Sequence, residues 1–75
     1  MKIYIDSKEI TRLKARAIQG DAGAQNELGV AHIGGLGVKR DYTEAARWFT
    51  NAAKQGHVYA QRNLEYLATI MRTPL

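Results

Sequence analysis

The stretch QGDAGAQNEL at residues 19–28 returns later in the chain as QGHVYAQRNL at residues 55–64. Glutamine, glycine, alanine, glutamine and leucine recur in register at an offset of 36 residues, from residue 19 to residue 55. Ala17 and Ala53 extend the match upstream. A period of roughly 20 to 50 residues is typical of solenoids and related repeat arrays. The sequence therefore predicts a repeat protein.

The segment before the second copy of this stretch has the spacing of an amphipathic helix. Asp41 and Glu44 stand three residues apart at its start, as in a capping box, and Gly56 supplies the left-handed residue that ends it. Trp48 flanks its apolar stripe. The stripe follows the i, i+3, i+4, i+7 pattern and consists of Tyr42, Ala45, Ala46, Phe49, Ala52 and Ala53.

Three further helices follow from the same pattern. The first runs over residues 7–19 with Asp6 as its cap, and another covers residues 21–33 up to Gly34. The last continues to Pro74, and its core side is expected to carry Ala60, Leu64, Leu67, Ala68 and Met71. Residues 2–5 alternate like a strand but are too few to pair alone. The expected fold class is all-α, with a core that contains Leu28, Phe49 and Leu64.

The spaced residues of the central segment resemble the Sel1-like repeat family, which is related to the tetratricopeptide repeats. The matching positions are Ala24, Gln25, Leu28, Gly29, His32, Gly35, Gly37, Val38, Asp41, Ala45, Trp48, Phe49, Ala52, Ala53 and Gly56, followed by Ala60, Gln61 and Leu64. The resemblance implies a short α-α superhelix of about four antiparallel helices. It also implies an adaptor that binds another protein on a concave surface.

The repeat boundaries predict one domain over residues 1–75. A full repeat spans about residues 21–56, and partial units flank it at residues 7–20 and 57–73. Three residues depart from the family pattern: His32 replaces the usual tyrosine, Glu65 replaces the usual close-packing glycine, and Ala68 replaces the next tyrosine. A glycine is needed at position 65 only if another helix packs on it, so Glu65 predicts that stacking ends at the last helix, as in a capping repeat.

Composition excludes several functional classes. The chain has 75 residues and no cysteine, so neither a disulfide nor a thiolate metal site is available to it. No apolar run approaches the roughly 20 residues of a membrane span, and Asp6 interrupts the apolar N-terminal segment before it could serve as a signal peptide. We therefore expect a cytoplasmic protein without membrane contact.

No motif in the sequence points to catalysis, a metal or a cofactor. The glycine-rich run at residues 34–40 follows a helix and lacks the Lys-Ser or Lys-Thr pair of a phosphate loop. His32, predicted to pack at a helix crossing, and His57, predicted to be exposed, lack a second ligand at helical spacing. Ser7 fits a helix cap. We expect a protein that is not an enzyme.

The first helix is rich in cations. Lys8, Arg12, Lys14 and Arg16 stand against Glu9, and the net charge is +4. A solvated helix face explains this pattern most simply, while an acidic protein partner and nucleic acid are the alternatives. Nucleic acid is not the expected partner, because no aromatic residues interleave with these cations for base stacking.

The binding surface is predicted from the last helix and from its counterpart 36 residues earlier. Tyr59, Arg62 and Tyr66 lie off its core side, and tyrosine and arginine are enriched among binding hot spots. By resemblance to the tetratricopeptide groove, the predicted partner-binding residues are Asn26, Val30, Ile33, Tyr59, Arg62, Tyr66 and Thr69. The two tyrosines could instead only pack or sit exposed. Because the repeats are few, a homodimer or another end-to-end self-assembly is a further expectation.

Overall fold

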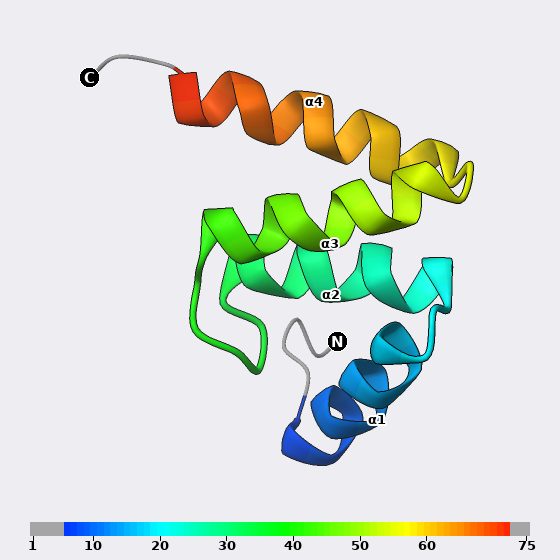
Figure 1. Cartoon of the computed structure of the whole chain (residues 1–75). Coiled ribbons are helices and arrows are strands. Elements are labelled where there is room, and N and C mark those ends of the chain that lie inside the picture. The colour runs from blue at the N-terminus through cyan, green and yellow to red at the C-terminus, as the bar shows by residue number, and fades with distance from the viewer. Residues whose placement is uncertain (1–5, 73–75) are drawn as a thin grey trace.

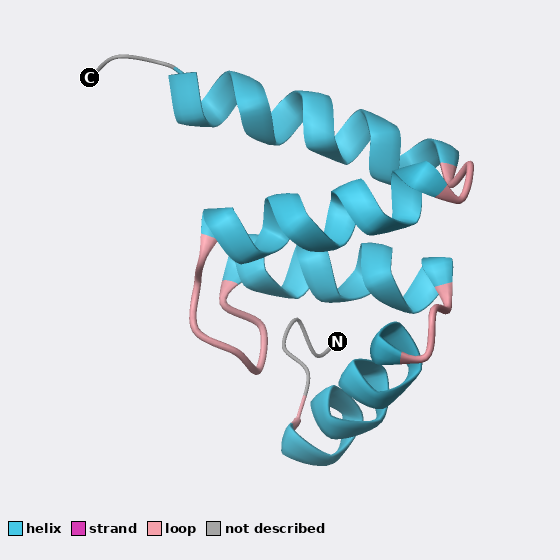
Figure 2. Ribbon diagram, in the orientation of Figure 1, coloured by secondary structure: helices cyan, strands magenta, loops and turns pink. Residues whose placement is uncertain are grey.

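The computed structural model of the chain describes residues 6–72. These residues form four helices, α1 (Ser7–Ile18), α2 (Ala22–Gly34), α3 (Tyr42–Lys54) and α4 (Val58–Arg72), and no strand (Figures 1 and 2). The predicted all-α class and the four helices are confirmed. The strand-like residues 2–5 and Pro74 lie outside the described residues.

Side chains that cap helix starts set the boundaries of three helices. The Asp6 carboxylate accepts from the backbone N–H of Glu9 at 2.8 Å, and Asp21 and Asp41 do the same three residues onward, at 3.0 and 3.1 Å. Each aspartate satisfies a donor that the helix leaves without an internal acceptor. Gly35, which follows α2, has a φ of 68°, a left-handed conformation that ends the helix at little steric cost.

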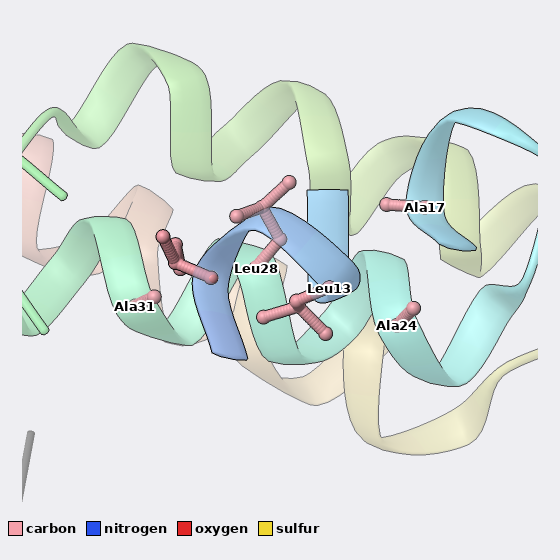
Figure 3. Packing of buried hydrophobic residues seen from close by; sticks show 6 residues of the cluster. Leu13, Ala17, Ala24, Leu28 and Ala31 are labelled. Carbon is pink, nitrogen blue, oxygen red and sulfur yellow. The ribbon is translucent and has the colours of Figure 1, made fainter. Parts of the chain in front are cut away.

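The helices stack in chain order, and α1 and α4 lie at opposite ends of the stack (Figure 1). One core cluster joins α1 to α2 and contains Ile10, Leu13, Ala17, Ala24, Leu28 and Ala31 (Figure 3). Leu36, Val38 and Trp48 pack against it. The apolar stripe predicted for the first helix is therefore buried as expected, and the α2–α3 loop helps to cover it.

A second core cluster joins α3 to α4. Its buried members are Ala45, Phe49, Ala52, Ala60 and Leu67. Leu64 is only partly buried against this cluster, while Ala68 and Met71, which were predicted on the core side, are exposed. This part of the prediction was wrong because α4 packs mainly against α3 and meets α2 through Asn63, so a narrower stripe of α4 is covered than if two helices flanked it.

The offset of 36 residues seen in the sequence also relates the helices. Moving α1 by 36 residues gives 43–54, which is α3 within one residue, and moving α2 gives 58–70, which is α4 without its last two residues. The chain therefore contains two copies of one helix pair. In this relation Leu13 is the counterpart of Phe49, and Leu28 is the counterpart of Leu64.

The closest approach in the stack is between α2 and α3. A Cβ atom at Gly29 would lie 2.5 Å from Cε1 and 2.6 Å from Cδ1 of Phe49. Real Cβ atoms do not approach non-bonded carbons this closely, so the absence of a side chain at Gly29 lets the Phe49 ring pack directly against α2. Phe49 is fully buried there, which makes this contact the centre of the repeat.

Two glutamines connect the ends of three helices by hydrogen bonds. Gln25, 6% exposed, donates through Nε2 to the Ala17 carbonyl at the end of α1 (3.1 Å). Its Oε1 accepts from Nε2 of Gln55, the residue that caps α3, at 3.0 Å, and Gln55 also donates to the Gly20 carbonyl at 2.9 Å. Because buried polar groups cost free energy when unpaired, this pair holds the helix ends in a defined register.

Candidate partner-binding surface

The seven predicted binding residues lie on α2 and α4, and we refer to them as the binding strip. Asn26, Val30 and Ile33 come from α2, and Tyr59, Arg62, Tyr66 and Thr69 come from α4. The strip is held together at one end, where Nδ2 of Asn63 donates to Oδ1 of Asn26 at 2.9 Å. Two helices that are not neighbours in the chain are thus joined side chain to side chain.

The exposed part of the strip is aromatic and apolar. Tyr59 is 68% exposed, Tyr66 62% and Val30 41%. Arg62 and Thr69 are exposed as well, whereas Asn26 is half-buried. Ile33 is also half-buried and packs against the second core cluster, so part of its side chain stabilises the fold.

Arg62 is the only charged member of the strip. Within residues 6–72 the ion pairs are Arg16–Asp21 and Arg47–Glu44, each at 3.0 Å, so the Arg62 guanidinium is not neutralised by a carboxylate there. An arginine flanked by two exposed tyrosines offers a hydrogen-bond donor and apolar area together. The strip therefore has the chemistry to receive a partner that carries an acid beside an apolar side chain.

Sequence reasoning missed Asn63 as a member of this surface. The prediction added 36 to Asn26 and arrived at Arg62, whereas the residue that contacts Asn26 is the next one along. Neighbouring repeats are displaced along the solenoid, so a residue on one unit meets a residue beside its own counterpart on the next. The offset alone gives equivalence between positions and says nothing about contact.

The two histidines have structural contacts. Nδ1 of His57 accepts from the Ala60 backbone N–H at 3.1 Å, so His57 starts α4 just as Asp21 starts α2. It is half-buried, and the prediction that it is exposed was wrong. Nδ1 of His32 lies 3.2 Å from the Lys39 carbonyl oxygen, and this places His32 against the α2–α3 loop. Residues 6–72 contain no cluster of three or more potential metal ligands.

The basic face of α1 is interleaved with acids. Arg16 donates to the Asp21 carboxylate through Nη2 at 3.0 Å. The backbone hydrogen bond from Ala24 and the bond from Arg16 hold the pKa of Asp21 below its usual value. Arg12 lines a shallow groove together with Glu9 and Glu27. A polyanion that approached α1 would therefore meet carboxylates among the cations.

Within the described part of the chain, no helix combines the length and apolar character needed to cross a membrane. The Sel1 repeat family matches residues 22–57, which comprise α2, α3 and the loops beside them. No curated protein and no solved structure matches the chain. The family match covers the segment that the Gly29–Phe49 contact and the Gln25–Gln55 pair hold together.

Proposed function

Since residues 22–57 of this chain form a Sel1 repeat, we propose that the protein is an adaptor that binds a partner protein along the binding strip. Sel1 repeats generally mediate protein–protein interaction, and the repeat is a non-catalytic one. The role we propose is binding without catalysis, in the cytoplasm. The observation that carries the proposal is the exposure of Tyr59 and Tyr66 on one helix, on either side of Arg62.

The exposed apolar side chains of the strip support this proposal. An isolated apolar residue on a surface is ordinary, but a contiguous patch marks an interaction site. Val30, Tyr59 and Tyr66 are three of the large hydrophobic side chains that the fold leaves exposed. The Asn26–Asn63 hydrogen bond fixes α2 relative to α4. A partner would therefore meet a surface that is already organised, which lowers the entropy cost of binding.

The test is site-specific photo-crosslinking in the native host. A photoreactive phenylalanine analogue placed at Tyr66 should capture a discrete protein, whereas the same analogue at Met71, also exposed on α4 but outside the strip, should not. The captured protein is then purified and titrated. Tyr59→Ala with Tyr66→Ala should weaken its binding at least about tenfold, and Met71→Ala should leave it unchanged. Equal capture at both positions would mean that the strip is not the binding surface.

Nucleic-acid binding through α1 is the alternative function. It predicts retention of DNA on filters with an affinity that falls steeply as salt rises. The Arg16–Asp21 ion pair and the acids beside Arg12 argue for the protein-binding role instead. Lys14→Glu, which alters an exposed cation of α1, would reduce binding only if the alternative holds.

A further inference from the structure

The two ends of the stack present unmatched helix faces. α3 packs Trp48 and Phe49 against α2, and the counterparts of these residues on α1 are Arg12 and Leu13. Within residues 6–72 no helix covers the exposed Arg12, whereas Leu13 is only 5% exposed because it also packs in the core cluster that joins α1 to α2. A shallow groove of about 220 Å³ is found beside these two residues, lined by Glu9, Arg12, Leu13, Arg16 and Glu27. We call it the end groove.

The opposite end of the stack has the complementary helix. α4 is the counterpart of α2, and the side of α4 that corresponds to the α3-facing side of α2 is open: Gln61 and Glu65 are exposed, while Gln25 and Gly29 are buried. We propose that α4 of a second copy of this chain docks in the end groove, in the register that α2 takes beside α3. Three contacts support this occupant when each is translated by 36 residues: two join α2 to the α3 segment, and one joins α2 to α4.

The first translated contact is the glutamine pair. Gln55 caps α3 and donates to Oε1 of Gln25. The counterpart of Gln55 is Gln19, which caps α1, and the counterpart of Gln25 is Gln61. Both are exposed glutamines, and neither side chain makes a hydrogen bond within residues 6–72. Docking would therefore re-form the same amide pair between two copies of the chain.

The second translated contact is the hydrogen bond between Asn26 and Asn63. The counterpart of Asn26 is Arg62 on α4, and the counterpart of Asn63 is Glu27 on α2. Where the single chain has two neutral amides in contact, two docked copies would therefore have a cation and an anion facing each other. Glu27 already lines the end groove, and neither residue has an ion-pair partner in the described part of the chain. Opposite charges at matched positions are the pattern that specifies a partner.

The third translated contact is that of Gly29 with Phe49. Its counterparts are Glu65 and Leu13. A glutamate cannot occupy the glycine position against a phenylalanine, because even a Cβ atom would lie 2.5 Å from Cε1 of the ring. Leucine lacks Cε1 and Cζ, two of the three ring atoms that would lie within 3 Å of such a Cβ atom, and its Cδ1 can move aside by a change of rotamer. Arg12 lines the same groove and offers the incoming carboxylate a cation, whereas Arg16 is already paired with Asp21.

This arrangement gives a different reason for the glutamate at position 65. Within residues 6–72 Glu65 is exposed, on a face of α4 that no other described helix covers. Between chains, the charge of Glu65 favours docking of α4 in the end groove, which contains cations, over docking on an apolar helix face such as that of α3. The contact is heterologous, with different surfaces on the two copies, so it produces open chains or closed rings of protomers.

The first test is the mass of the protein in solution as a function of concentration. Sedimentation velocity of the whole chain should show association that increases from micromolar to millimolar concentration and weakens with added salt. A monomer throughout this range would overturn the proposal.

Charge reversal then identifies the surfaces. Arg62→Glu and Glu27→Arg should each weaken association about tenfold or more, because like charges then face each other. The double variant should recover it. Lys14→Glu makes the same change of charge on the exposed surface of α1 outside the groove and should have no effect. Association that withstands both single reversals would show that copies meet elsewhere.

Crosslinking gives the register directly, since the chain has no native cysteine. A mixture of Gln19→Cys and Gln61→Cys chains, treated with a short bis-maleimide, should yield the mixed dimer. Lys14→Cys mixed with Gln61→Cys should not. Equal yields from the two mixtures would overturn the register.

Stacking and the proposed function fail in distinguishable ways. Glu27 lies outside the binding strip, so Glu27→Arg should reduce self-association and leave partner capture at Tyr66 intact. The double variant Tyr59→Ala with Tyr66→Ala should weaken binding of the partner and leave self-association intact. Circular dichroism of each variant checks that the helices are retained.

Discussion

α2 and α4 are counterparts in sequence, yet they differ in what surrounds them. α2 lies between α1 and α3, whereas α4 packs mainly against α3 and meets α2 through Asn63. Leu28 on α2 is 1% exposed, while its counterpart Leu64 is only partly buried. Gln25 is buried and hydrogen bonded, while Gln61 is exposed. The same pattern of residues thus becomes core on one helix and surface on the other.

The difference shows where the stability of a repeat comes from. Each unit buries its apolar face only against its neighbours, so a residue stabilises the fold according to the number of helices that cover it. A chain of this size has a total stability of about 4–11 kcal/mol. Making the same substitution at equivalent positions of α2 and α4 therefore measures how much the surrounding helices contribute.

The largest effect is expected at the equivalent leucines. Leu28→Ala should cost about 2–5 kcal/mol, because it leaves a cavity between α1 and α2 that the core cannot fill. Leu64→Ala removes the same atoms from a half-open site, so its cost should be about 1–2 kcal/mol. Urea unfolding followed by circular dichroism gives both values. Equal losses would break the comparison between the two helices.

The next effect concerns the glycine position. Gly29→Ala should cost about 1–3 kcal/mol, because the new methyl group forces α2 and the Phe49 ring apart. Alanine favours helix formation over glycine by about 1 kcal/mol, so any loss of stability here reports the clash itself. At the equivalent position Glu65→Ala should stay within about 0.5 kcal/mol. Thermal unfolding of the Gly29→Ala and Glu65→Ala variants measures both effects. A Gly29→Ala variant more stable than the parent protein would refute the close contact between α2 and Phe49.

A smaller effect is expected at the start of α4. His57→Ala removes the acceptor for the Ala60 N–H and should cost about 0.5–2 kcal/mol. His57→Asp installs the residue that caps α2 and should preserve the stability. Equilibrium unfolding at neutral pH compares the two variants with the parent protein. If alanine and aspartate behave alike, the imidazole does not act as the cap.

The smallest effect is the pH dependence contributed by Asp21. Its pKa is lowered in the folded state, so its charged form stabilises the fold above the unfolded pKa of about 3.9. That contribution should be lost as the pH falls through the lower folded pKa. Asp21→Asn keeps a capping side chain without the charge. The difference in Tm between the two proteins should therefore be constant near neutral pH and shrink below about pH 4, and a difference that persists in acid would contradict this.

Much of the fold could be predicted because local chemistry decides it. Asp6, Asp21 and Asp41 begin helices through hydrogen bonds that span three residues, and such bonds need no tertiary context. The 36-residue offset gave the equivalence of α1 with α3 and of α2 with α4. The binding strip came from the same offset. Its tyrosines and Arg62 are exposed as a binding surface requires, and binding itself stays a prediction.

Only the tertiary structure decided which residues are covered. The sequence placed Ala68 and Met71 on the core side of α4, but α4 packs mainly against α3, and both residues are exposed. It could not show that Asn63 meets Asn26, because that contact depends on how two units are displaced relative to each other. Periodicity along one helix is fixed by the backbone, whereas burial depends on which helices lie beside it in space.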